Sequence, residues 1–348
     1  MKYGAIGPVA SYVPDAVESN ADLAASNPSW NMDVIYEKTG IRTRHIAGAE
    51  ECVSDMGVQA AERLFAEHDV DRDSVDFLLF CTQTPDYPLP TTACLVQERL
   101  GLPTSIGALD YNLGCSGYIY GLSLADGLIR SGAAERILLI TSEAYSKYIH
   151  PTDRSLRTIF GDGATATLVE AADQPSLGHF VFGTDGSGAD TLMVADGGGC
   201  PAERAMKPRK RKRWPSRLYM DGPELLQFAL GAIPKAVNGV LEKAGIGREE
   251  VDYYLLHQAT SYLLENVRTR MSLEREELPV ELADYGNTVS CTLPILIESM
   301  RDGDRLKPGR QSVLVGFGVG LSWAACLWEE TYEAVVQESP QQFCRRAA

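Results

Sequence analysis

The chain contains 348 residues with a mass of 37.9 kDa, enough for about two domains of ordinary size. Hydrophobic residues make up 45% and charged residues 23%, a globular composition that excludes disordered, collagen-like and coiled-coil chains. An excess of acidic residues gives a net charge of −15 and a pI near 4.8, which argues against nucleic-acid binding and favours small-molecule chemistry.

The N-terminal segment and the cysteines limit where the protein is expected to work. The first residues, MKYGAIGPVASYVP, lack the apolar core of a secretory signal, and no stretch reaches the roughly 18 apolar residues that a membrane-spanning helix needs. The 8 cysteines include no C-x-x-C pair and the 5 histidines are scattered, so we expect no metal site. We therefore predict a cytoplasmic protein with reduced cysteines.

The chain repeats its own pattern. Residues 60–83 and residues 236–259 both read as an amphipathic helix, a polar turn and an apolar strand. Matched positions lie 176 residues apart, and the same spacing joins Cys115 to Cys291 and continues into the strand that begins at Ile137. A repeat this long indicates a duplicated α/β unit, because solenoid repeats have much shorter periods.

The duplication predicts two pseudo-symmetric halves in one layered body. Strands such as 77–81 and 137–141 are continuous apolar runs, as expected for strands covered by helices on both faces. The predicted fold class is therefore α/β, with alternating layers of helix and sheet. We assign residues 1–175 to the first half, 176–336 to the second half and 337–348 to a tail.

Cys115 lies in the segment DYNLGCSG, before residues 119–129, whose apolar positions have helical spacing. It therefore occupies a turn at a helix N-terminus, where free N–H groups and the positive end of the helix dipole favour a thiolate. Small neighbours, Gly114 and Ser116, leave the sulfur room for a substrate. By itself such a cysteine is as often structural as nucleophilic, and Cys291 holds the equivalent place in the second half.

Two polar residues mark a strand end and a turn in the second half. His257 ends the strand VDYYLLHQ, where the first half has Cys81, and Asn287 lies in a Gly-Asn turn. Each residue alone is more often structural than catalytic. Together with Cys115 they suit thioester chemistry, with a thiolate nucleophile, an imidazole hydrogen bond and an amide donor to an oxyanion.

Two further segments stand out. Residues 316–323, GFGVGLSW, form a glycine-rich turn that is too short and wrongly spaced for a P-loop or a dinucleotide fingerprint. The turn is explained equally well as a tight connection or as a source of backbone N–H groups for an oxyanion hole. A run of basic residues between positions 204 and 217 predicts an exposed insertion.

Seven short motifs occur in the order found in one enzyme family. They are TGIRTR at 39–44, the Cys115 turn, PTDR at 151–154, FGDGA at 160–164, HQA at 257–259, GNT at 286–288 and FGVG at 317–320. With these motifs the chain resembles β-ketoacyl-[acyl-carrier-protein] synthase III from about residue 2 to residue 328. The resemblance implies a duplicated thiolase-like αβαβα fold and a homodimeric condensing enzyme without metal or bound cofactor.

The resemblance also implies a role for each matching residue. Cys115 would take an acyl primer from coenzyme A as a thioester. His257 and Asn287 would hold the carbonyl of a malonyl-type thioester on an acyl carrier protein while carbon dioxide leaves. The backbone N–H groups of Cys115 and Val319 would form the oxyanion hole. Two basic residues match positions that face the coenzyme A nucleotide: Lys38 and Arg154.

Several positions depart from the family pattern. Val34 replaces a tryptophan that stacks on adenine, and Leu89 replaces the phenylalanine with which the partner subunit closes the primer pocket. The arginine that docks the carrier protein beyond the catalytic histidine is missing. We expect part of the basic run to replace it: Lys210, Arg211, Lys212 and Arg213. These departures indicate a specialised member with a primer longer than acetyl, and a carrier-bound primer is one possibility.

Two alternatives to a decarboxylating condensation remain open at this point. The first is a related acyltransferase that moves the Cys115 acyl group onto oxygen or nitrogen, or that joins two long acyl chains in a specialised pathway. The second is a non-catalytic partner subunit of a two-component synthase. Such subunits lack the nucleophile, whereas this chain has Cys115.

Overall fold

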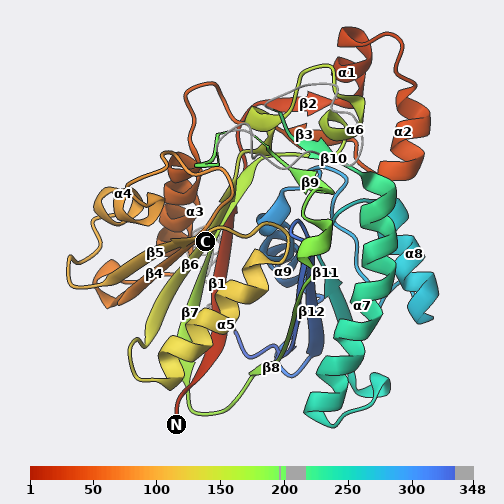
Figure 1. Ribbon diagram of the computed structural model, residues 1–348. Coiled ribbons are helices and arrows are strands. Elements are labelled where there is room, and N and C mark those ends of the chain that lie inside the picture. The colour runs from red at the N-terminus through yellow and green to blue at the C-terminus, as the bar shows by residue number, and fades with distance from the viewer. Residues whose placement is uncertain (196, 201–216, 334–348) are drawn as a thin grey trace, which may run out of the picture.

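The computed structural model describes residues 1–195, 197–200 and 217–333. Two central sheets stand side by side, with helices on their outer faces and between them (Figure 1). The basic run, with Lys210, Arg211, Lys212 and Arg213, and the predicted tail lie outside the described residues. The division of the halves at residues 175 and 176 stays a prediction.

The first sheet has five strands and the order β1-β7-β6-β4-β5. Their bounds are β1 (Tyr3–Tyr12), β7 (Gly163–Ala172), β6 (Arg136–Glu143), β4 (Phe77–Cys81) and β5 (Gly107–Tyr111). Strand β4 runs parallel to β5 and β6, whereas β7 runs antiparallel to β1 and β6. The apolar runs that predict β4 and β6 are buried along nearly their whole length.

The second sheet repeats this order with one strand fewer. It has the order β11-β12-β13-β8, and its strands are β11 (Tyr253–Leu256), β12 (Gln311–Gly318), β13 (Ser322–Glu329) and β8 (Leu177–Thr184). Strand β11 is parallel to β12, as β4 is to β6, and β13 is antiparallel to both neighbours, as β7 is. The predicted duplicated α/β fold is confirmed.

The long helices complete the layers. Helices α3 (Val53–Glu67) and α4 (Thr92–Arg99) contact the first sheet, and α7 (Gly222–Ala244) contacts the second sheet, with α8 (Ser261–Met271) packed beside it. Helices α5 (Gly117–Arg130) and α9 (Thr292–Asp302) lie between the sheets. The buried interior there includes Leu79, Ile119, Leu296, Leu314 and Trp328. Each such side chain contributes roughly 1.5–3 kcal/mol of hydrophobic stabilisation.

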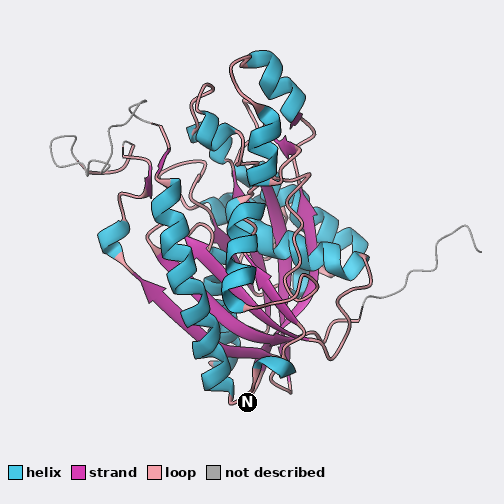
Figure 2. Ribbon diagram, turned by 90° about the vertical axis from the view of Figure 1, so that its right-hand side faces the viewer, coloured by secondary structure: helices cyan, strands magenta, loops and turns pink. Residues whose placement is uncertain are grey.

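Smaller elements gather at one end of the sheets (Figures 1 and 2). They are α1 (Asn20–Ser26), α2 (Met32–Thr39), α6 (Arg154–Arg157), β2 (Val17–Ser19), β3 (Thr43–His45), β9 (Leu192–Met193) and β10 (Tyr219–Met220). Short 3-10 helices connect the larger elements: η1 (Arg72–Ser74), η2 (Tyr145–Tyr148), η3 (Gly186–Gly188), η4 (Arg248–Glu250) and η5 (Val289–Cys291). Among the residues described, no helix has the length and apolar character needed to cross a membrane.

Candidate active site

Cys115 lies where the sequence predicts it, in the turn between β5 and α5, two residues before the helix begins. Its side chain is 6% exposed. Two glycines leave little free space around the turn that carries this sulfur. A Cβ added at Gly318 would lie 2.9 Å from Cys115 Sγ, and one at Gly114 would lie 2.4 Å from Gln83 Oε1. Glycine at 318 therefore lets the strand end of the second half approach the sulfur.

Two backbone N–H groups face this sulfur, those of Cys115 and Val319, and both lower the pKa of the thiol. Burial has the larger effect and, together with the charge of Glu143, raises that pKa to about 12. The thiol is therefore the favoured form of Cys115, contrary to the expectation of a thiolate at the helix N-terminus. Desolvation of the sulfur outweighs the dipole and the two N–H groups, so the thiol must lose its proton during the reaction.

His257 follows β11 and is 1% exposed. Its backbone N–H donates to Val315 O over 2.9 Å, which holds the residue at the end of the second sheet. Ring atom Nδ1 lies 2.7 Å from Thr292 Oγ1, and the ring packs edge-on against Phe317. Burial lowers the pKa of His257 to about 3, so the imidazole is neutral at ordinary pH. With Nδ1 occupied by Thr292, Nε2 is the nitrogen left for a ligand.

Asn287 is fixed by its own backbone and by its side-chain oxygen. Its N–H donates to Ile159 O over 2.9 Å, and its carbonyl accepts from Gly161 N over 3.1 Å. Its Oδ1 accepts from Val289 N over 2.9 Å. The preceding Gly286 has φ +70°, and a Cβ there would lie 2.8 Å from Ile159 O, so only glycine fits. With Oδ1 occupied, the Asn287 amide NH₂ is left as a hydrogen-bond donor.

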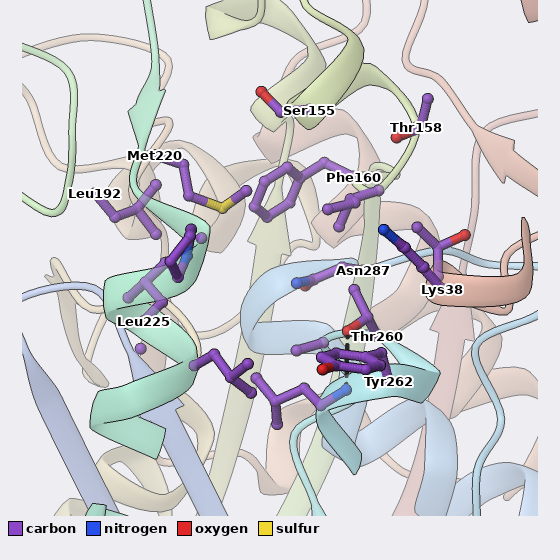
Figure 3. A pocket seen from close by; sticks show the side chains of 18 of the residues that line it. Lys38, Ser155, Thr158, Phe160, Leu192, Met220, Leu225, Thr260, Tyr262 and Asn287 are labelled. Carbon is purple, nitrogen blue, oxygen red and sulfur yellow. Dashed lines mark hydrogen bonds between the residues drawn. The ribbon is translucent and has the colours of Figure 1, made fainter. Parts of the chain in front are cut away.

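The three residues line one pocket of about 900 Å³. Figure 3 shows Asn287 between two walls, with Lys38 and Tyr262 on one side and Leu192, Met220 and Leu225 on the other. The walls therefore come from α2 and α8 on one side and from β9, β10 and α7 on the other. A neutral imidazole, an amide donor and a thiol thus meet in a mostly apolar cavity, a setting that strengthens hydrogen bonds to a developing negative charge.

The other predicted site residues fall into two groups. Lys38 and Arg154 line the same pocket, as does Val34, whose side chain is 46% exposed. Leu89 does not line this pocket within the described chain and is 82% exposed. A role for Leu89 in a primer pocket would therefore require a second subunit, as the family resemblance implies.

The sequence alone does not identify the residues that orient His257 and Asn287. Thr292 is one of them, and its position 176 residues after Ser116 is the only sequence signal that connects it with the Cys115 turn. Val289 is the other: it holds Asn287 Oδ1 and adopts φ +58°, unusual for a β-branched residue. Within the described ranges, no three His, Cys, Asp or Glu side chains gather in a way that could hold a metal ion.

Comparison with known proteins identifies the family. The model of 3-oxoacyl-[acyl-carrier-protein] synthase III matches residues 109–186, and the model of its C-terminal part matches residues 241–329. The β-ketoacyl-[acyl-carrier-protein] synthase III of Lactococcus lactis subsp. lactis is 37% identical over 333 residues, which cover 94% of this chain and 99% of the relative. The chain belongs to the 3-oxoacyl-[acyl-carrier-protein] synthase III family.

Solved structures of synthase III enzymes agree with this assignment. A 2.1 Å crystal structure of a 3-oxoacyl-(acyl-carrier-protein) synthase III superposes with a TM-score of 0.90 at 46% identity, covering 94% of this chain and all of the other. A synthase from Burkholderia xenovorans LB400 gives a TM-score of 0.89 at 36% identity, covering 95% of both chains. The protein is therefore a thiolase-like condensing enzyme and an acyltransferase, and the two alternatives are not favoured.

Proposed function

We propose that this synthase III loads an acyl primer on Cys115 and condenses it with a malonyl-type thioester carried by an acyl carrier protein. The observation that carries the proposal is the meeting of Cys115, His257 and Asn287 in one pocket. In the first half-reaction the Cys115 sulfur bonds to the acyl carbon of a donor thioester. The donor's own carbon–sulfur bond breaks, and the thiol proton ends on the departing sulfur.

The second half-reaction uses the donors opposite the sulfur. In the tautomer in which Nδ1 of His257 accepts from Thr292 Oγ1, Nε2 carries the proton. This Nε2–H and the amide of Asn287 bind the carbonyl oxygen of the malonyl thioester and stabilise the enolate that forms as carbon dioxide leaves. The enolate carbon then attacks the acyl carbon on Cys115. The N–H groups of Cys115 and Val319 hold the resulting oxyanion, which collapses to the 3-oxoacyl product as the Cys115 sulfur leaves.

The donor is a coenzyme A or carrier-protein thioester, and no bound cofactor takes part. Lys38 and Arg154 supply positive charge to its phosphates at the pocket. Val34 offers no aromatic face for adenine, which supports a carrier-bound donor.

For the carrier we assign docking to Lys210, Arg211, Lys212 and Arg213, because basic residues steer acidic partners. Replacing these four by Gln should raise KM for the carrier-bound substrate and flatten its salt dependence; an unchanged KM would exclude this role.

We also propose a cytoplasmic homodimer. Strand β5 pairs only with β4 among the described strands, which leaves one edge of the first sheet open. Exposed apolar side chains occur on β5, on α5 and on β8, namely Leu109, Leu124 and Phe182. An open edge and an apolar surface favour pairing with a second copy. Analytical ultracentrifugation should find twice the chain mass, and a monomer at micromolar concentration would contradict the proposal.

The decisive experiment follows both half-reactions by mass. The protein is mixed with acyl-coenzyme A or an acyl carrier protein, and the peptide that contains Cys115 should gain the mass of the acyl group. Addition of malonyl carrier protein should then release carbon dioxide, free Cys115 and give a 3-oxoacyl carrier protein. Acylation without a condensed product would point to the acyltransferase alternative, and no mass gain with any donor would point to the partner-subunit alternative.

A further inference from the structure

Glu143, the last residue of β6, is a carboxyl group that the proposed reaction leaves without a role. It is 0% exposed, and it forms no salt bridge within the described chain. Its Oε2 accepts from the backbone N–H of Gln83 over 3.1 Å, and its Oε1 lies 3.1 Å from Ser290 Oγ. A longer contact of 3.5 Å reaches Thr84 Oγ1. Both carboxyl oxygens are therefore engaged inside the protein.

These partners belong to two segments that both border the Cys115 turn: a Cβ at Gly117 would lie 3.7 Å from Ser290 Cβ. Gln83 belongs to the loop after β4, and its side chain is so close to Gly114 that a Cβ there would lie 2.4 Å from Gln83 Oε1. It thus supports the turn that carries Cys115. Ser290 lies in η5, between Asn287 and Thr292, which holds His257. One carboxyl group consequently connects the loop that contacts the Cys115 turn to the segment that carries Asn287 and Thr292.

Burial of Glu143 opposes a negative charge more strongly than its hydrogen bonds with Gln83, Ser290 and Thr84, which lower the pKa, favour one. The groups that interact electrostatically with it are three thiols, three phenols and one carboxyl group: Cys81, Cys115, Cys291, Tyr111, Tyr145, Tyr148 and Asp162. Burial is the main reason that the pKa of Glu143 rises to about 8. When Glu143 does ionise, its charge raises the pKa of Cys115 further. A charged Glu143 would therefore make the nucleophile harder to activate.

We propose that Glu143 is a positioning residue that acts as a neutral carboxylic acid. It holds the Gln83 loop and the Ser290 turn in fixed positions next to the Cys115 turn. When Glu143 is ionised, Oε1 accepts from Ser290 Oγ; in the neutral acid this bond reverses, and Oε1–H donates to Ser290 Oγ while Oε2 accepts from Gln83 N–H. The proposal rests on the proposed condensation only for its effect on decarboxylation. Its effect on the Cys115 thiol is independent of any acyl substrate.

Two substitutions separate the hydrogen bonds of Glu143 from its charge. In Glu143→Gln the amide can donate to Ser290 and accept from Gln83, so it reproduces the neutral acid at every pH. In Glu143→Leu both hydrogen bonds are lost. Glu298→Gln is the matched control, because Glu298 is also a largely buried carboxyl group with a raised pKa but interacts with Ser11 and Arg63 instead. Each variant is assayed for malonyl decarboxylation and for the rate at which iodoacetamide alkylates Cys115.

The expected results differ for each variant. At pH 7, Glu143→Gln should decarboxylate at close to the rate of the unmodified protein, whereas Glu143→Leu should lose about 10-fold to 100-fold. At pH 9, Glu143→Gln should alkylate about 3-fold faster than the unmodified protein, with no difference at pH 6.5. Glu298→Gln should match the unmodified protein in both assays. Should Glu143→Leu not fold, Ser290→Ala removes one bond alone and should slow decarboxylation without changing the alkylation profile.

Three results would overturn the proposal. One is loss of decarboxylation in Glu143→Gln at pH 7, which would show that the charge is needed. Another is full decarboxylation in folded Glu143→Leu, or in Ser290→Ala if the leucine variant does not fold. The last is identical alkylation of Cys115 between pH 6.5 and 9.5 with and without Glu143. Absence of decarboxylation in the unmodified protein would instead contradict the proposed function, and the alkylation profiles would still test Glu143.

Discussion

The turn before α5 and the turn before α9 occupy equivalent places in the two halves, yet they differ in chemistry. Cys115 lines the pocket and faces two backbone N–H groups. Cys291 is fully buried, with Sγ 3.2 Å from Gly163 O and 3.4 Å from Thr141 O. A cysteine at the same place in the repeat is thus open to a ligand in one half and enclosed by protein carbonyls in the other.

The same contrast extends to the residues around each cysteine. Positions 176 residues apart pair the three residues near Cys115 with three in the first half: His257 with Cys81, Asn287 with Tyr111 and Val319 with Glu143. In the first half Cys81 Sγ donates to Leu113 O and Tyr111 Oη donates to Gly117 O, so these groups serve the fold. Duplication thus produced two places of similar backbone, and the side chains open one and fill the other.

Exchange of each cysteine for alanine tests this contrast most strongly. Cys115→Ala should lower condensation by more than about 10³-fold, because the covalent site is gone while a small residue still fits the turn. Cys291→Ala should keep condensation and lose about 1 kcal/mol of stability through a small cavity. Steady-state rates and urea unfolding measure both effects. Normal turnover by Cys115→Ala would refute the covalent mechanism, and loss of activity in folded Cys291→Ala would refute the contrast.

Removal of the two donors should produce the next largest effect. His257→Ala and Asn287→Ala should each slow malonyl decarboxylation by about 10²–10³-fold while Cys115 still accepts an acyl group. Tyr111→Phe, the matched change in the first half, should stay within about 3-fold, because its hydroxyl contacts Gly117 O and Cys81 rather than the pocket. Carbon dioxide release and the acyl mass on Cys115 distinguish the two half-reactions. Failure of either alanine variant to acylate would reject this division of roles.

Stability should respond to pH in opposite directions at the two places. Burial lowers the pKa of His257 from 6.5 to about 3, so the unfolded chain binds more protons below pH 6.5, and stability falls as pH drops from there. Burial raises the pKa of Glu143 from 4.5 to about 8, so stability falls as pH rises across that range. Thermal melts between pH 4.5 and 9 should show that His257→Gln removes the fall in stability below pH 6.5 and that Glu143→Gln removes the fall between pH 4.5 and 8. Parallel curves for all three proteins would contradict both shifts.

Much of the fold can be predicted from the sequence because apolar runs and the internal repeat indicate the strands and helices directly. The apolar run 77–81 predicts β4 with its observed bounds, and the repeat predicts the matching strand order of the two sheets. Cys115 and His257 are proposed for the same reason, because one precedes a helix and the other follows a strand whose pattern is clear, whereas Asn287 is proposed from its Gly-Asn turn only in combination with them. The helix expected from residue 236 is only the second part of α7, which begins at Gly222, with Pro223 in its first turn, and ends at Ala244.

The protonation of the site could not be predicted in this way. The pKa of Cys115 depends on burial by segments far away in the chain, and local spacing suggests a thiolate where the thiol is favoured. Glu143 ends an apolar strand, so nothing nearby in the sequence indicates its contact with Ser290, 147 residues later. Only the repeat, which pairs Glu143 with Val319, draws attention to it. Electrostatics and long-range contacts need the tertiary structure.

The smallest expected effect concerns Leu89, which tests whether the first half of a second subunit completes the site. Leu89 is exposed in the single chain and smaller than the phenylalanine of the family pattern, so a primer longer than acetyl should fit against it in a dimer. Leu89→Phe should shift preference toward acetyl by roughly 10-fold in kcat/KM, the scale of one or two methylenes in an apolar pocket. Val280→Phe, at an exposed apolar position outside the proposed pairing surface, is the control and should leave the preference unchanged. Strict acetyl preference in the unmodified enzyme, or equal shifts in both variants, would rule out this role, and the pocket would then be built by one chain alone.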